Sequence, residues 1–187
     1  MDQRDLVMRA KRGDQDAFAV LAGAAIARLD GAARLILRDD ELARDAVQDA
    51  LVRAWRDLPG LRDPDRFDAW LRRLTVNACL DVARRRRRRS IEVELTPILM
   101  PSVADETAGV AEREQLDRAL RTLDPEWRAI VVQHFFLGMP LAEIATAMGI
   151  PVGTVKSRLH RSLQAMRLLL ADTDRDALES LPGGQFA

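Results

Sequence analysis

Apolar residues recur along most of this 187-residue chain at the three-to-four spacing of amphipathic helices. In the first half this pattern predicts four helices, separated by short polar gaps and by one loop rich in proline and glycine. The four expected helices run from about Asp2 to Lys11, from Asp14 or Gln15 to Leu37, from Asp40 to Leu58, and from Phe67 into the arginine run Arg84 to Arg89. No segment alternates with the period of a strand, and aromatic residues make up only 4% of the chain. We therefore expect an all-α fold that begins with a helical bundle.

The helical pattern lapses from about Ser90 to Gly109, where prolines and acids occur without any basic residue. This stretch predicts a flexible linker. Two further helices are expected after it, from about Ala111 to Leu123 and from Glu126 to Leu137. Beyond Leu170 the sequence is acidic and contains two adjacent glycines, which predicts a frayed tail. The expected division is 1–90 for a first domain, 91–110 for the linker, 111–170 for a second domain, and 171–187 for the tail.

The segment from Pro140 to Arg167 has the spacing of a helix-turn-helix. Leu141, Ile144 and Met148 share one face of a short helix, and Gly149 supplies the permissive backbone of the turn. The following helix directs an apolar stripe inward and a polar set outward: Gly153, Ser157, His160, Arg161 and Gln164, with Lys156 beside them. Such a face suits the major groove of DNA.

An ordinary helical hairpin with a solvated outer face is the simpler interpretation of this segment. Two observations disfavour it. The small residue Ala145 falls where the helices would cross, and no aspartate or glutamate occurs between Pro151 and Arg167. We therefore favour a DNA-reading helix.

The formal net charge is zero, but the charges are segregated along the chain. Residues 1–90 hold 20 basic against 15 acidic residues, and residues 112–170 hold 8 against 6. Residues 91–111 hold 4 acids and no base, and residues 171–187 hold 4 acids against 1 base. Two basic blocks separated by an acidic connector are compatible with nucleic-acid binding in spite of the neutral total.

A polar stripe follows one side of the expected helix that begins at Phe67: Trp70, Arg73, Asn77 and Arg84. Bases can stack on an indole, an amide can bond a base edge, and arginines neutralise phosphates, so this stripe is suited to separated DNA strands. The alternatives are a core position for Trp70 and a solvated, fraying helix end for the arginine run.

The sequence offers few residues for catalysis or for metal binding. Cys79 is expected to be a core residue, and neither His134 nor His160 has ligand partners at metal-binding spacing, so we expect no metal, no cofactor and no catalytic residue. Neither a leader segment nor a bilayer-spanning stretch is evident, which predicts a cytoplasmic protein.

Four motifs in order give the chain a family resemblance: GDQDAF from Gly13, DAVQDALVRAW from Asp45, FDAWLRRLTVNACLDVARRRRRR from Phe67, and PVGTVKSRLHRS from Pro151. In this order and separation the chain resembles bacterial extracytoplasmic-function sigma factors, the compact two-domain members of the sigma-70 class. The resemblance covers nearly everything from Asp5 to Leu170. It implies that the chain binds core RNA polymerase, through its beta and beta-prime subunits, and promoter DNA.

The resemblance also implies roles for individual residues. Polymerase docking would fall to Asp45, Gln48, Asp49 and Arg53. The loop from Leu58 to Arg66 would capture a flipped base of the minus-ten element. The residues that would recognise and melt this element are Leu61, Arg62, Arg66, Trp70, Arg73, Asn77, Arg84 and Arg85. Recognition of the minus-thirty-five element would fall to Gly153, Thr154, Lys156, Ser157, Arg158, His160 and Arg161.

Two other functions stay open at this point. A stand-alone helix-turn-helix regulator would bind duplex DNA without polymerase, although the Trp70 stripe is then unexplained. A protein stored by an anti-sigma factor is compatible with the first interpretation, and the acidic tail is a candidate regulatory element in cis. The acids of the linker, Glu92, Glu94, Asp105 and Glu106, are candidates for mimicking nucleic acid in the polymerase cleft.

Overall fold

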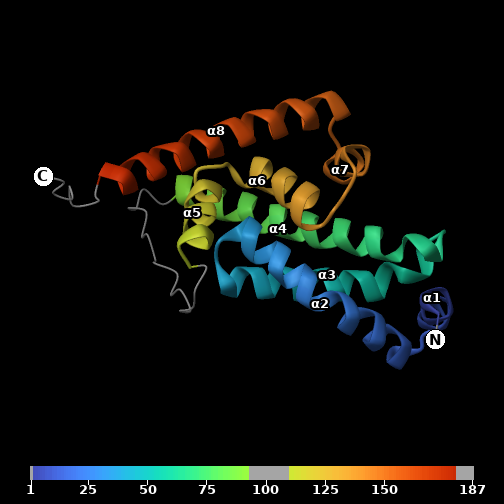
Figure 1. Ribbon diagram of the computed structural model, residues 1–187. Helices are drawn as coiled ribbons and strands as arrows, with labels where there is room; N and C mark the ends of the chain where they lie inside the picture. The colour runs from blue at the N-terminus through green and yellow to red at the C-terminus, as the bar shows by residue number, and fades with distance from the viewer. Residues whose placement is uncertain (1, 93–109, 180–187) are drawn as a thin grey trace, which may run out of the picture.

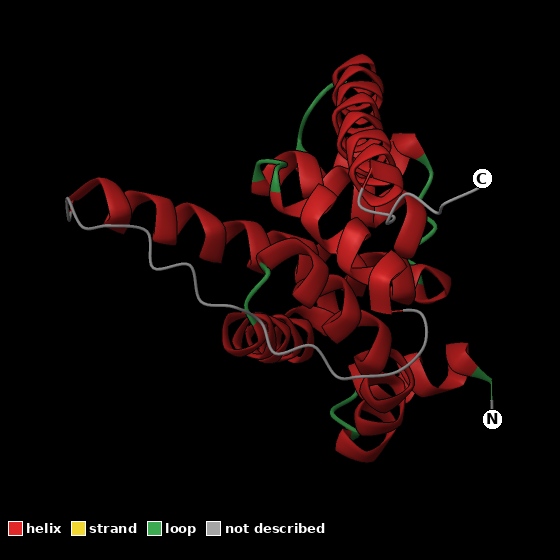
Figure 2. Cartoon of the chain, turned by 60° about the vertical axis from the view of Figure 1, so that its left-hand side comes forward, coloured by secondary structure: helices red, strands yellow, loops and turns green. Residues whose placement is uncertain are grey.

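The computed structural model of the chain describes residues 2–92 and 110–179, and these ranges contain helices without a single strand (Figure 2). The α-helices are α1 (Gln3–Lys11), α2 (Gln15–Leu37), α3 (Asp40–Asp57), α4 (Phe67–Glu92), α5 (Val110–Arg121), α6 (Pro125–Val131), α7 (Leu141–Met148) and α8 (Val152–Glu179). Two 3-10 turns, η1 (Leu58–Gly60) and η2 (Pro64–Arg66), and a π-helix, η3 (Val132–Phe136), complete the described part. The predicted all-α fold class is confirmed.

Aspartates start two helices of the first half. The side chain of Asp14 accepts a 3.0 Å hydrogen bond from the amide of Ala17, and Asp39 accepts one of 3.0 Å from the amide of Leu42. Each carboxylate satisfies an amide that the first turn of a helix leaves without a partner. Between these caps, α2 ends at Arg38, whose φ of 58° lies in the left-handed region. The four helix positions expected from the hydrophobic pattern are therefore confirmed.

Small residues hold the first bundle together. Along the packed faces of α2 and α3, alanines with at most 1% of their surface exposed let the helix axes approach closely: Ala32, Ala33, Ala43, Ala46, Ala50 and Ala54. Phe67, Leu71 and Val76 of α4 close the core with side chains that are almost completely buried. The core is thus aliphatic and tightly spaced, as the alanine-rich sequence predicts.

The structure corrects one expectation about the second half. The single helix expected from Glu126 to Leu137 changes into the π-helix η3 after Val131, and the amide of Leu137 donates to the carbonyl of Val132 at 3.0 Å. The wider turn leaves Phe136 40% exposed while Leu137 is buried. Helix α8 continues past Leu170 to Glu179, and no glycine or proline occurs between Leu170 and Pro182. Residues 93–109 of the expected linker and residues 180–187 of the tail lie outside the described residues.

The two halves of the chain pack against each other. Figure 1 shows α6 between α4 and α8, and α7 beside the start of α8. Contacts join α4 to α6 and α7, and α2 to α6 and η3. No described helix combines the length and the apolar character that crossing a bilayer requires.

Candidate nucleic-acid interfaces

The N-terminal part of α8 presents the polar face expected of a recognition helix. Gly153, Lys156, Ser157, His160 and Arg161 are exposed, and Thr154 is half-buried. On the opposite side of the same turns the side chains of Val155 and Leu159 are buried against the core. The structure therefore brings the outward residues together on one accessible surface, with polar groups free to reach an external partner.

The turn before α8 fixes the direction of this helix. Gly149 ends α7 with a φ of 66°, which glycine adopts without the steric cost that other residues bear. The amide of Ile150 then donates to the carbonyl of Ala145 at 3.1 Å. The predicted helix-turn-helix geometry is present.

Arg158 is the member of this set that the structure places elsewhere. Its side chain is only 27% exposed and turns toward α6, where Nη1 donates to Oε2 of Glu126 at 3.2 Å. In this arrangement Arg158 is engaged with the protein and not with the outward face of α8.

The second polar surface follows α4. Arg73, Arg84 and Arg85 are exposed, while Trp70 and Asn77 are half-buried. The Trp70 ring lies 6.0 Å from that of Phe67, so its position is set by packing on the core. Trp70 thus has both properties considered for it, since one part of the indole packs inward and another part faces the cleft described below.

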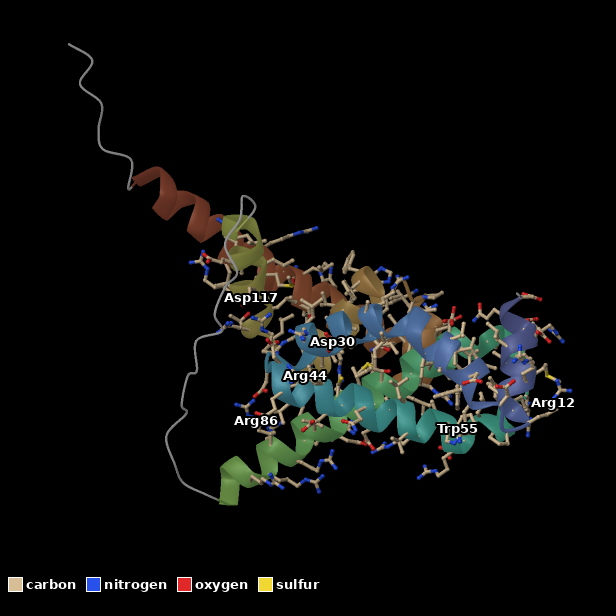
Figure 3. All side chains as sticks on the ribbon, turned by 90° about the horizontal axis from the view of Figure 1, so that it is seen from below. Arg12, Asp30, Arg44, Trp55, Arg86 and Asp117 are labelled. Carbon is tan, nitrogen blue, oxygen red and sulfur yellow. The ribbon has the colours of Figure 1, made fainter. Side chains whose placement is uncertain are left out.

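The basic end of α4 is held by ion pairs. Arg84 lies 3.4 Å from Asp81 and 3.6 Å from Glu126, measured between nitrogen and oxygen. Arg86 lies 3.4 Å from Asp39, at the start of α3 (Figure 3). These pairs and the continuation of α4 to Glu92 show that the arginine run belongs to an ordered helix.

The loop before α4 is anchored by apolar side chains. Leu58, Leu61 and Pro64 are buried, and Nζ of Lys11 donates to the carbonyl of Leu61 at 2.6 Å. Two predicted minus-ten residues, Arg62 and Arg66, remain exposed on the loop. The Leu61 side chain is in the core, so its contribution to the surface is the position it gives the loop.

The predicted docking surface lies on α3. Asp45 and Gln48 are exposed, and Asp49 pairs with Arg53 at 2.6 Å. Arg53 also lies 3.5 Å from Asp81 of α4. The four predicted residues therefore form one charged face that remains on the surface in this arrangement.

A cleft of about 420 Å³ lies between α7 and the polar surface of α4 that contains Trp70. Leu61, Arg66, Trp70 and Arg73 line one wall, and Met139, Ala142, Glu143, Thr146 and Ala147 line the other. Glu126 and Glu143 carry no distinguishing signal in the sequence, because each is an ordinary acid in the first turn of a helix. Only their position opposite the basic surfaces of the other half distinguishes them.

The described residues offer little for catalysis or metal binding. They contain no group of three or more histidine, cysteine, aspartate or glutamate side chains placed to hold a metal ion. Cys79 is buried, and desolvation raises the pKa of its thiol to about 12, which leaves it without nucleophilic character at neutral pH.

Comparison with known proteins shows the family to which both halves of the chain belong. The family model described as sigma-70 region 2 matches residues 24–89, and that described as sigma-70, region 4 matches residues 113–166. The chain is 37% identical over 145 residues to the RNA polymerase sigma-E factor of Streptomyces avermitilis. This matched stretch covers 78% of the present chain and 80% of the relative. It is 39% identical over 158 residues to the ECF RNA polymerase sigma factor SigM of Mycobacterium tuberculosis, covering 84% and 79% of the two chains.

Two solved structures share the fold. CnrH, in complex with the cytosolic domain of CnrY, gives a TM-score of 0.66 at 30% identity and covers 91% of this chain and 97% of that one. RpoE, in complex with the anti-sigma factor NepR from Bartonella quintana, gives a TM-score of 0.70 at 24% identity, over 82% and 96% of the two chains.

Proposed function

Because the chain belongs to the extracytoplasmic-function sigma factors of the sigma-70 family, we propose that its two halves divide promoter recognition between them. The protein is a sigma factor that directs promoter-specific initiation of transcription by core RNA polymerase. The observation that supports this most strongly is the succession of region 2 and region 4 within one chain. A stand-alone regulator is not favoured, because it does not account for the first of these regions.

We assign the minus-thirty-five element to the second half, residues 111–170. Gly153, Lys156, Ser157, His160 and Arg161 are exposed on the first turns of α8, and the buried side of that helix fixes them against α7. Side chains of these types bond base edges and phosphates in the major groove. Thr154 and Arg158 complete the proposed set, Arg158 once it leaves Glu126.

Recognition and melting of the minus-ten element belong to the first half, residues 1–90. An indole that packs on the core with one part and faces a cleft with another is a preformed stacking platform for an unpaired base. Arg62 and Arg66 on the loop, Arg73 and Asn77 on α4, and Arg84 and Arg85 further along would guide the backbone of the separated strand.

Core polymerase binds the α3 face through Asp45, Gln48, Asp49 and Arg53 in this proposal. The exposed carboxylate of Asp45 and the half-buried one of Asp49 support it, because surface charge of one sign favours association with a partner surface of the opposite sign. An anti-sigma factor is a further candidate partner, since the sigma factor RpoE, which shares the fold, is bound to the anti-sigma factor NepR in its structure. Catalysis then belongs to the polymerase, the chain itself has no enzymatic role, and it acts in the cytoplasm, where polymerase and promoters are found.

Transcription from a promoter library tests this function. The purified chain is mixed with bacterial core polymerase at a fixed salt concentration, and run-off transcripts are sequenced. We expect transcripts from a shared promoter motif that are absent without the chain. Duplex binding without polymerase binding, across several cores, would contradict the proposal.

A further inference from the structure

Helix α1 lies before the segment that the region 2 family model matches, which begins at residue 24. In Figure 1 it lies beside the turn that joins α3 to α4, and contacts join it to both 3-10 turns of that connection, η1 and η2. These turns belong to the minus-ten loop, residues 58–66, which is assigned to the flipped base. The position of α1 therefore bears on promoter recognition.

The backbone of the minus-ten loop closes two short turns. In η1 the amide of Leu61 donates to the carbonyl of Leu58 at 3.0 Å. In η2 the amide of Arg66 donates to the carbonyl of Asp63 at 3.1 Å. Between the turns, Leu61 and Asp63 have extended backbone. Each of the two hydrogen bonds orders one turn, and neither sets the direction of the connecting residues, which include Arg62.

Two side chains of α1 reach the minus-ten loop from outside. Nζ of the half-buried Lys11 donates to the carbonyl of Leu61 at 2.6 Å, where the connection between the turns begins. Nη1 of Arg4 lies 2.6 Å from Oδ2 of Asp65 in η2, but both side chains are more than half exposed, and exposed ion pairs contribute little because water and salt screen them. The Lys11 bond is partly buried and has a charged donor, so it is the stronger of the two contacts.

Helix α1 is a rigid base for this contact. Leu6, Val7 and Ala10 are at most 6% exposed in the core of the first bundle. At the other end of the helix, Nε2 of Gln3 donates to Oδ1 of Asp68 at 2.9 Å, in the first turn of α4. The core thus determines where α1 lies, and α1 determines where the Lys11 ammonium meets the loop. Recognition groups must be held within about 0.5 Å of their productive geometry, which a support of this kind provides.

We propose that Lys11 is a positioning residue for minus-ten recognition, whose bond to the Leu61 carbonyl fixes the connection that carries Arg62 and so sets the base preference of the loop. This inference rests on the proposed function, in which the loop captures the flipped base. Lys11 acts through the backbone of the loop and does not itself touch the promoter. Without the bond the loop stays attached by its buried side chains but can shift, while α8 and the α3 face are unchanged.

Three substitutions isolate the bond. Lys11→Met removes the donor and keeps an unbranched apolar stem. Lys11→Arg keeps the positive charge and a donor for the same carbonyl. Arg12→Met is the matched control for charge, because Arg12 is the next residue, is exposed, and lies at the C-terminal end of α1.

The wild type and the three variants are each mixed with core polymerase and a promoter library in which both promoter elements are randomised, and the transcripts are sequenced. Lys11→Met should lower the preference for the favoured base at one or two minus-ten positions by about tenfold, which is the scale of one mismatched base pair. Lys11→Arg and Arg12→Met should keep the wild-type preferences. The minus-thirty-five preferences are an internal control, because α8 reads that element, and they should stay the same in all four proteins.

The proposal is overturned if Lys11→Met keeps the minus-ten preferences of the wild type, or if Lys11→Arg or Arg12→Met loses as much discrimination as Lys11→Met. Equal losses at both promoter elements would also count against it, since a shift of the minus-ten loop does not reach α8. Circular dichroism checks that each variant is folded, and Lys11→Gln, whose donor is one atom nearer the backbone, replaces Lys11→Met should that variant fail to fold. Failure of the sigma function is recognised separately, because the wild type itself would then give no promoter-specific transcripts.

Discussion

Arg128 and Ile36 are joined by a 2.8 Å hydrogen bond that crosses from one half of the chain to the other. The same guanidinium donates to the carbonyl of Leu123, also at 2.8 Å. Burial, and after it the nearby charge of Arg38, lower the pKa of Arg128 to about 10, so the group stays charged at neutral pH. The buried cation of Arg128, which belongs to the second half of the chain, therefore caps the C-terminal end of α2 in the first half.

Replacing Arg128 with methionine should destabilise the chain. The change keeps a long apolar stem but leaves the carbonyls of Ile36 and Leu123 without donors, at a cost of about 2 kcal/mol in the free energy of unfolding. Urea titration followed by circular dichroism measures it. Arg118→Met, at an exposed position on α5, is the control, and equal midpoints for the two variants would contradict this role for Arg128.

Stability should depend on Asp14 in acid. Its pKa lies below the ordinary value of 3.8, because the amide of Ala17 and then the side chain of Arg9 bond the carboxylate. A carboxyl whose pKa is lowered by folding stabilises the chain at pH values above 3.8, and this contribution is lost as the pH falls through the lowered pKa.

The melting temperature of wild type and Asp14→Asn, recorded as a function of pH, tests this assignment. The difference between them should be largest near neutrality and should shrink in acid below pH 3.8. Asp16→Asn removes a carboxylate from the same turn without touching the bond to Ala17. A constant difference at every pH would show that the Asp14 carboxylate does not act through its charge.

Strand opening should depend on the ring at position 70. Trp70→Ala removes the stacking platform and should weaken the open promoter complex by about 1–3 kcal/mol, whereas Trp70→Phe keeps an aromatic face and should retain most of the activity. Permanganate reactivity of unpaired thymines in the minus-ten element measures opening directly. Equal reactivity for the alanine and phenylalanine variants would mean that the indole serves only the core.

Recognition of the upstream element should depend on Lys156 more than on Arg167, which is exposed further along α8. If Lys156 contacts a phosphate, Lys156→Ala weakens binding for all promoters and lowers the salt slope by about 1. If it contacts a base, the loss is about 1–3 kcal/mol and is confined to one promoter position. Binding of the variants to core polymerase on a set of single-base promoter changes distinguishes these outcomes, and equal losses for Lys156→Ala and Arg167→Ala would contradict the assignment.

The sequence predicts the helices well because their signals are local. Asp14 and Asp39 as caps, Gly149 as the turn, and the apolar stripe of α8 each act within a few residues. The end of α8 has no clear local signal, because no glycine or proline occurs between Leu170 and Pro182. The π-helix at Val132–Phe136 has no comparable local signal.

The packing between the halves could not be predicted from the pattern. Arg128 and Glu126 stand in PEWRAIV as ordinary charged residues of a short helix, and only their partners 92 and 32 residues away in the chain, Ile36 and Arg158, give them their roles. Gly31 carried a weak signal, because a glycine within a helix is costly and often marks a close approach, here of Phe136. Long-range charge pairing leaves no period in the sequence to detect.

The uninterrupted run of α8 has a mechanical consequence. Its 28 residues form a rod about 42 Å long, which carries the exposed polar face at one end and reaches Glu179 at the other. Because α8 also packs against α5 and α6, the direction of the exposed polar face depends on helices that lie far from it along the rod.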